Sequence, residues 1–174
     1  MESVPFDFQD HKGKRPLYMA YWLMKSEPDE FSIDDLVRAP KQTTPWFGVR
    51  NYLARNFMRD RMKIGDGVLF YHSSCPEPGI AGIAKVSSTP YPDETQFDPK
   101  GDYFDPKATR ENPRWMLVDV TLEKKTRLIS LAEMRAAKPL EGMITLQRGN
   151  RLSITPVTPA EWKHVGKLLA RDAG

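Results

Sequence analysis

The sequence has few of the residues that metal sites and disulfides need. It contains one cysteine, Cys75, and three histidines among 174 residues. A single cysteine excludes a disulfide within the chain and is typical of a reducing compartment, so we expect a cytoplasmic protein. Three histidines without ligand spacing argue against a structural metal site, and we expect no cofactor.

Long apolar segments are missing as well. No run of about 18 apolar residues is present, which argues against a membrane-spanning helix and a membrane partner. The N-terminus also lacks the apolar core of a signal peptide. A chain of 174 residues is the size of one domain. We expect a polar tail or extension over residues 1–18, one domain over residues 19–174, and a monomer.

The chain carries little excess charge of either sign. Its 26 Lys and Arg residues and 23 Asp and Glu residues give a formal net charge of +3, which permits an anionic partner without requiring one. The distribution is more informative, because Arg50, Arg55 and Arg59 gather in one segment and acidic residues gather over 93–105. This separation predicts a local basic patch on the protein surface.

Short apolar runs bounded by turns predict strands. These runs are residues 20–25, 67–73, 78–88, 114–128 and 150–157. Caps followed by apolar residues at three-to-four spacing predict a short helix after Ser32 and helices over 52–62, 130–136 and 158–172. The apolar face expected for the helix over 52–62 consists of Leu53, Phe57, Met58 and Met62. Strands separated by irregular loops favour an α+β fold with a mixed or antiparallel sheet bent into a small barrel.

An aromatic turn leads into the basic segment, in the stretch PWFGVRNYLARNFMRDRM. Trp46 follows Pro45 and precedes Gly48, so it lies outside the periodic helix. A ring beside guanidinium groups suits nucleic acid, because the ring can stack on a base while the cations meet phosphates. Two simpler interpretations stay open: the tryptophan packs in the core, and the arginines face solvent.

Two other groups of residues are candidates for chemistry. Cys75 lies three residues after His72, but adjacent positions on a strand and its turn do not aim at each other, which argues against a nucleophilic pair. Lys25, Ser26 and Glu27 end the first predicted strand. A binding site and a solvated turn are equally consistent with that position.

Four long motifs resemble one known family. They are YWLMKSEPDEFSIDDL, WFGVRNYLARNFMRD, KIGDGVLFYHSSCPEPGIAGIAKV and RLSITPVTPAEW. They are similar to the EVE domain, a family of the PUA-like superfamily that includes bacterial proteins and a eukaryotic thymocyte nuclear protein. The resemblance covers residues 21–169, and the extension before Met19 departs from the usual bacterial pattern.

The resemblance implies a PUA-like fold, with a mixed and mainly antiparallel β-barrel and flanking helices. EVE domains look like relatives of YTH domains, which hold a methylated adenine in an aromatic cage, and are associated with modified bases, including modified cytosines in DNA. By this resemblance Lys25, Ser26 and Trp46 would match the cage, and Trp115 would form a facing wall. Gly48 would let the backbone approach the edge of the base.

We therefore predict a non-catalytic reader of modified bases in DNA or RNA. The ligand-binding residues expected are Lys25, Ser26, Glu27, Trp46, Gly48, Val49, Asn51, Tyr52, His72, Ser73 and Trp115. The phosphate-binding residues expected are Arg50, Arg55, Arg59 and Arg148. Two alternatives stay open: an enzyme acting on a nucleotide or small acid, with Glu27 and His72 as acid and base, and a small-metabolite binding module.

Overall fold

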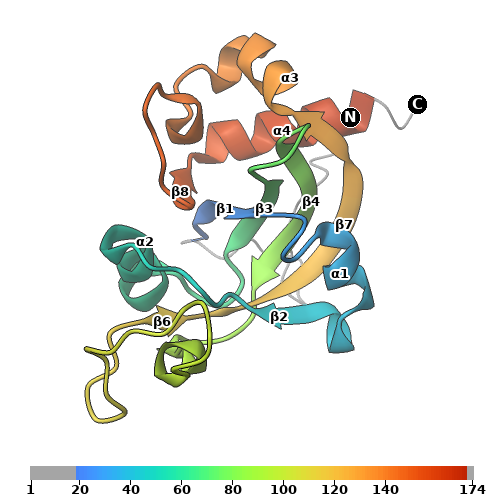
Figure 1. The fold of residues 1–174 in the computed structure, drawn as a ribbon. Coiled ribbons are helices and arrows are strands. Elements are labelled where there is room, and N and C mark those ends of the chain that lie inside the picture. The colour runs from blue at the N-terminus through green and yellow to red at the C-terminus, as the bar shows by residue number, and fades with distance from the viewer. Residues whose placement is uncertain (1–18, 172–174) are drawn as a thin grey trace.

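Six strands form one sheet in the computed structural model, which describes residues 19–171 (Figure 1). The sheet has the order β2-β7-β4-β3-β1-β8. Its strands are β1 (Tyr21–Ser26), β2 (Thr43–Pro45), β3 (Gly67–His72), β4 (Gly79–Val86), β7 (Asp119–Ser130) and β8 (Ile154–Val157). A separate pair joins β5 (Tyr91–Pro92) to β6 (Met116–Leu117).

The pairing confirms the prediction of a mixed, mainly antiparallel sheet in an α+β fold. Strands β1 and β3 run parallel, with Tyr21 opposite Gly67 and Ser26 opposite His72. The other pairs of strands are antiparallel. Within residues 19–171 no pairing joins β2 to β8, the two outer strands of the order, so closure into a barrel is not confirmed.

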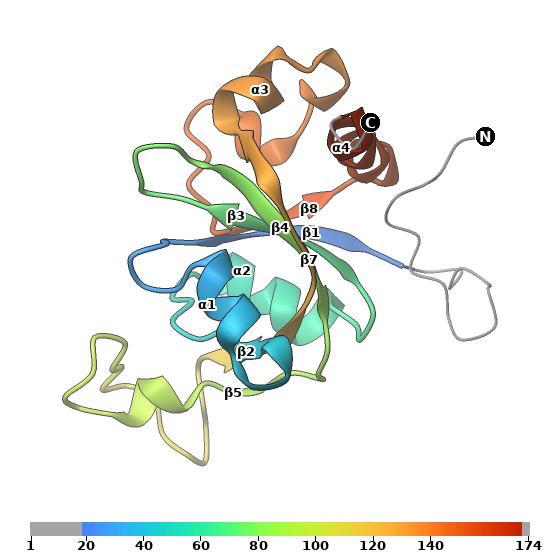
Figure 2. The ribbon, with the colours of Figure 1, turned by 90° about the vertical axis from the view of Figure 1, so that its right-hand side faces the viewer.

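Helices cover both faces of this sheet (Figures 1 and 2). The helices α1 (Ile33–Arg38) and α2 (Tyr52–Asn56) lie on one side, and α3 (Leu131–Ala136) and α4 (Pro159–Arg171) lie on the other. Helix α2 continues into a π-helical turn, η2 (Phe57–Arg61). The short 3₁₀ turns are η1 (Pro40–Gln42), η3 (Glu94–Phe97), η4 (Lys138–Leu140) and η5 (Ile144–Leu146).

Alternating side chains of the central strands build two cores. Trp22 and Met24 pack with Phe70 and with the residues of α1, α2 and η2. Tyr21 and Leu23 point to the opposite face and pack with the residues of α3 and α4. A period of two along each strand places these two sets on opposite faces, which explains why β1 and β3 are almost wholly apolar.

The helix predicted over 52–62 packs by Phe57, Met58 and Met62, which are all buried, but not by Leu53. The prediction for Leu53 is wrong, because 47% of this residue is exposed while Ala54 beside it is fully buried. The helix therefore turns Ala54, Phe57 and Met58 towards the sheet, a set with the three-and-four spacing of one helical face. The π-helical bond from Met62 N–H to Phe57 O, 2.8 Å long, then closes the segment.

The predicted tail over residues 1–18 lies outside the described residues. No helix within residues 19–171 is long and apolar enough to cross a membrane. The segment 114–128, expected as one strand, is divided into β6 and β7. The segment 90–113, which contains many prolines and aspartates and no long apolar run, contains β5 and η3.

Candidate functional site

A cavity of about 390 Å³ lies where β1 and β3 end side by side. Ser73 N–H donates to Ser26 O at 3.0 Å and extends the parallel pairing to its mouth. Such a volume falls within the range of small-ligand pockets. We call it the strand-end cavity; its wall consists of Lys25, Ser26, Glu27, Glu30, Phe31, Thr44, Pro45, Trp46, Phe47, Gly48, Val49, Arg50, Ser73, Ser74, Tyr103, Arg151 and Ser153.

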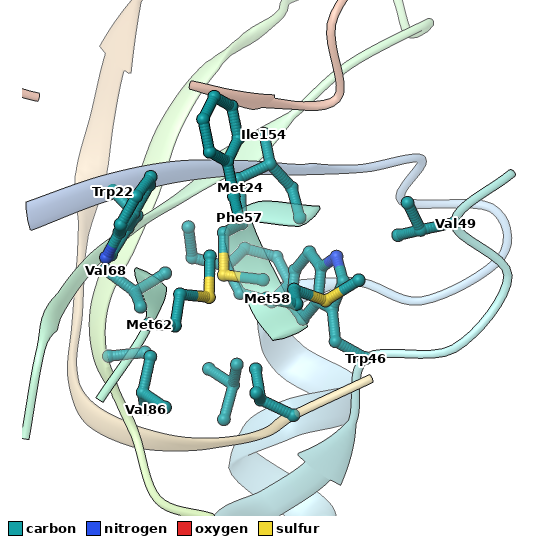
Figure 3. Packing of buried hydrophobic residues seen from close by; sticks show 14 of the residues in the cluster. Trp22, Met24, Trp46, Val49, Phe57, Met58, Met62, Val68, Val86 and Ile154 are labelled. Carbon is teal, nitrogen blue, oxygen red and sulfur yellow. The ribbon is translucent and has the colours of Figure 1, made fainter. Parts of the chain in front are cut away.

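Trp46 belongs both to this wall and to the core. Only 7% of the residue is exposed, and Figure 3 shows it within the buried cluster. Its ring meets Phe70 edge-on, with centroids 5.4 Å apart, and its backbone N–H donates to Val118 O at 2.9 Å. The sequence left two interpretations of Trp46 open, a ring offered to a ligand and a core residue. The structure places it in the core and leaves a small part of it in contact with the cavity.

Tyr103 forms a second aromatic wall, which the sequence did not indicate. Its ring lies over Gly48, where an added Cβ would come within 2.7 Å of Tyr103 Cζ, and Gly48 has a φ of +83°. Both facts favour glycine at this position. Tyr103 O–H donates to Glu30 Oε1, and burial, followed by this bond, raises the pKa of Tyr103 to about 12. The phenol therefore stays a donor at neutral pH.

A buried carboxylate holds this wall in place. Asp93 Oδ2 accepts from Gly48 N–H at 2.8 Å and from Arg50 Nη1 at 3.1 Å, and the Asp93 side chain is 1% exposed. Arg50 also donates to Tyr103 O from Nε at 3.1 Å and from Nη2 at 2.8 Å. Asp93 and Arg50 thus tie the 90–113 segment to the Trp46–Gly48 turn.

Several predicted ligand residues lie away from the strand-end cavity. Asn51 caps α2, and its Oδ1 accepts from Ala54 N–H at 3.0 Å. Tyr52 and Trp115 stack on each other, with centroids 4.9 Å apart, and Trp115 Nε1 donates to Asp105 at 2.8 Å. The cavity brings together Lys25, Ser26, Glu27, Trp46, Gly48, Val49 and Ser73 of the predicted set.

The arginines predicted to bind phosphate differ in their surroundings. Arg50 donates within the chain to Val49 O, Asp93, Thr95 and Tyr103 O. Arg55 donates to Arg114 O at 2.8 Å and to Asn56, while Arg59 pairs with Asp60 at 2.8 Å. Arg148 is exposed and has no ion pair within the described part of the chain.

His72 contacts the start of α1 and does not line the strand-end cavity. Its Nε2 accepts from Ile33 N–H at 3.0 Å, and it is not among the lining residues, whereas Glu27 is. Burial lowers the pKa of His72, and the charge of Asp34 acts weakly in the opposite direction. A neutral imidazole whose Nε2 already accepts a backbone hydrogen bond has a structural role. Because His72 and Glu27 do not share the cavity, this disfavours them as an acid–base pair.

We expect the protein to lose stability as the pH falls below about 6.5, the ordinary pKa of histidine. The pKa of His72 is lower in the folded state, so the unfolded state takes up the proton first and gains stability from it. The His72→Gln variant keeps a hydrogen-bond acceptor but cannot be protonated, so its free energy of unfolding should change less with pH. Urea unfolding of both proteins between about pH 5.5 and 7.5 measures this. His164 is present in both proteins and contributes equally to their pH dependence. Equal pH dependence of the two stabilities would therefore contradict the prediction for His72.

No group of three or more His, Cys, Asp or Glu side chains within residues 19–171 is arranged to hold a metal ion.

Comparison with known proteins covers almost all of the described chain. The family model for the EVE domain matches residues 20–168. Human thymocyte nuclear protein 1 is 45% identical over 171 residues, which are 88% of this chain and 75% of that protein. The matched region contains every residue that lines the strand-end cavity.

Two solved structures are similar along their whole length. A crystal structure from Pseudomonas syringae is 49% identical with a TM-score of 0.81, and covers 86% of this chain and 99% of that one. The crystal structure of the human THYN1 protein in complex with DNA containing 5-methylcytosine is 45% identical with a TM-score of 0.81. It covers 86% of this chain and 96% of that one.

Proposed function

This chain belongs to the EVE domain family, and from that premise we propose that it is a non-catalytic reader that binds a modified base of DNA in the strand-end cavity. The observation that carries the proposal is the human relative's complex with DNA containing 5-methylcytosine, at 45% identity over the same fold. We infer that 5-methylcytosine is the ligand of this chain too. The base leaves the duplex to enter the cavity.

The cavity offers what a cytosine ring requires. Trp46 and Tyr103 present aromatic surface from two different segments, and Val49 adds apolar contact for a methyl group. The Glu27 side chain lines the cavity without a hydrogen bond or ion pair in residues 19–171. In the proposal its carboxylate accepts from the cytosine N4 amino group, a pairing that acidic side chains make with cytosine.

Energies indicate why aromatic walls alone are insufficient. Extruding a base costs a few kcal/mol, and stacking returns about 1–3 kcal/mol per base. The polar wall supplies the rest in this proposal. Lys25 and Ser73 can donate to the carbonyl oxygen and ring nitrogen of the base, whereas Glu27 accepts from its amino group. The Ser26 hydroxyl already donates to Phe31 O at 2.6 Å, so it can only accept.

The proposal is tested by a binding panel at one fixed salt concentration. The panel contains duplexes of one sequence with cytosine, 5-methylcytosine or 5-hydroxymethylcytosine, and an RNA with methylated adenine. We expect the duplex with 5-methylcytosine to bind more tightly than the unmodified duplex. Equal affinity for the modified and unmodified duplexes would refute the proposal. Preference for the RNA with methylated adenine would show that the ligand is a different modified base.

Removing the second aromatic wall should weaken this preference. Tyr103→Ala loses the ring over Gly48, and we expect a loss of about 1–3 kcal/mol in binding the modified duplex. Tyr103→Phe keeps the ring and loses the bond to Glu30, so it should retain most of the affinity. If Tyr103→Ala binds like the wild type, the base does not contact this residue.

A further inference from the structure

A second cavity adjoins the first and carries only positive charge. It has a volume of about 510 Å³ and is bounded by the end of β3, by α3 and by the loop after η5. We call it the loop cavity; its wall consists of Lys25, Tyr71, Leu131, Arg135, Thr145, Leu146, Gln147, Arg148, Gly149 and Asn150. The wall contains three cationic side chains and no carboxylate.

Within residues 19–171 the cations of this cavity have no anionic partner. Arg135 and Arg148 are exposed, and no ion pair or hydrogen bond of their side chains is present in residues 19–171. Arg50, Arg55 and Arg59, in contrast, are hydrogen-bonded within the chain. Arg61, at the end of η2, also has no ion pair or hydrogen bond of its side chain within residues 19–171, but its guanidinium group lies over the Trp22 and Phe57 rings, 5.3 and 5.4 Å from their centroids. The wall of the loop cavity presents two guanidinium groups without such a partner. They are free to bind a phosphate in a forked geometry.

Lys25 lies in the walls of both cavities. The side chain is half-buried, and its ammonium group lies 5.9 Å from the centre of the Tyr71 ring, with no carboxylate bonded to it among the described residues. Burial lowers its pKa, with no opposing anionic contribution. A partly desolvated ammonium group without a counter-ion is stabilised when an anion arrives.

The loop that carries Arg148 is held by its own hydrogen bonds. Gln147 Nε2 donates to Glu141 O and to Met143 O, both at 3.0 Å. Gly149 then turns the chain with a φ of +79°. The arginine is thus presented from a fixed turn, so binding an anion requires little ordering of the backbone.

We propose that the loop cavity binds the backbone phosphate next to the nucleotide whose base occupies the strand-end cavity, with Lys25 facing both groups. This rests on the proposed function. The bound strand then runs from the ends of β1 and β3 towards α3 and the 147–150 turn, and not along α2 and η2. Arg151, which lines the strand-end cavity and is exposed, extends the cationic track between them.

The test is the salt dependence of duplex binding by an Arg135→Gln/Arg148→Gln variant. Removing one phosphate contact should reduce the slope of log affinity against log salt by about 0.9, and affinity should fall by the same factor for modified and unmodified duplexes. The matched control is Lys63→Gln. Lys63 precedes β3, at the opposite end of the parallel pair, and is exposed, so its replacement should leave the slope near the wild-type value.

Failure of this proposal and of the proposed function are distinguishable. If the wild type prefers the modified duplex but the double variant keeps the wild-type slope of log affinity against log salt, the phosphate site alone is overturned. A wild type that binds duplexes without preference, with a slope that falls in the double variant, refutes base recognition and supports the phosphate site. Absence of all DNA binding overturns both. Titration with inorganic phosphate tests whether the cavity binds the free ion instead of a DNA phosphate. Saturable binding of phosphate at this cavity, together with an unchanged salt slope of duplex binding in the double variant, also overturns the proposal.

Discussion

Trp46→Ala should lower the free energy of unfolding by about 3–5 kcal/mol, the usual cost of truncating a buried aromatic residue. Trp46 is 7% exposed and its ring packs on Phe70, so removal of the ring leaves a cavity in the core beside the strand-end cavity. Binding of the modified duplex should fall as well, because the same ring forms part of the cavity wall. Urea unfolding and duplex affinity are to be measured on one sample, at a temperature at which the variant is folded.

Phe57→Ala provides the matched control for Trp46→Ala. Phe57 is buried in the same cluster, 8% exposed, but it does not line the strand-end cavity. We expect a comparable loss of stability and an unchanged preference for the modified base in the folded protein. If Trp46→Ala keeps both wild-type stability and wild-type preference, Trp46 is neither a core residue nor part of the cage.

Asp93→Ala should also cost about 3–5 kcal/mol of stability, the range for removing one partner of a buried ion pair. The change leaves Arg50, 22% exposed, without its carboxylate and removes the acceptor for Gly48 N–H. Because Arg50 also holds Tyr103 O, the second aromatic wall should lose its position, and duplex affinity should fall together with stability. Unfolding midpoints in urea and a binding curve measure the two effects.

A surface ion pair serves as the comparison for Asp93→Ala. Asp60 accepts from Arg59 at 2.8 Å, yet both side chains are about half-exposed, at 51% and 42%. Asp60→Ala should therefore change stability by less than about 1 kcal/mol. A similar small effect for Asp93→Ala would show that the Arg50–Asp93 pair does not stabilise the 90–113 segment.

The sequence was sufficient to predict most strands, because near-continuous apolar runs such as GVLFYH identify strands that are buried on both faces. Periodicity was less reliable at the edge of a helix face, where Leu53 and Ala54 are neighbours and only the docking angle decides which is buried. Barrel closure depends on whether the outer strands pair, and no local pattern specifies that.

The candidate site was only partly visible in the sequence for a physical reason. Lys25, Ser26 and Glu27 were candidates because they end a predicted strand. The parallel pairing of β1 with β3, which the sequence did not specify, brings Ser73 beside them. Tyr103 lies in a loop with many polar residues, and its role arises from long-range contacts with Gly48 and Arg50. The basic face of the helix was visible at once, but spacing does not reveal that its arginines already have partners.

The position of β1 in the sheet affects the order in which the protein can assemble during synthesis. This first strand lies between β3 and β8, with Met24 opposite Ile154, and Lys25 N–H donates to Ser153 O at 2.8 Å. The ribosome therefore releases β1 long before its second neighbour exists. Until β8 emerges, the nascent chain carries an open, apolar strand edge of the kind that pairs with other chains. The strand-end cavity also stays incomplete until then, because Arg151 and Ser153 of its wall follow β7 in the chain and are among the last parts of the described fold to be made.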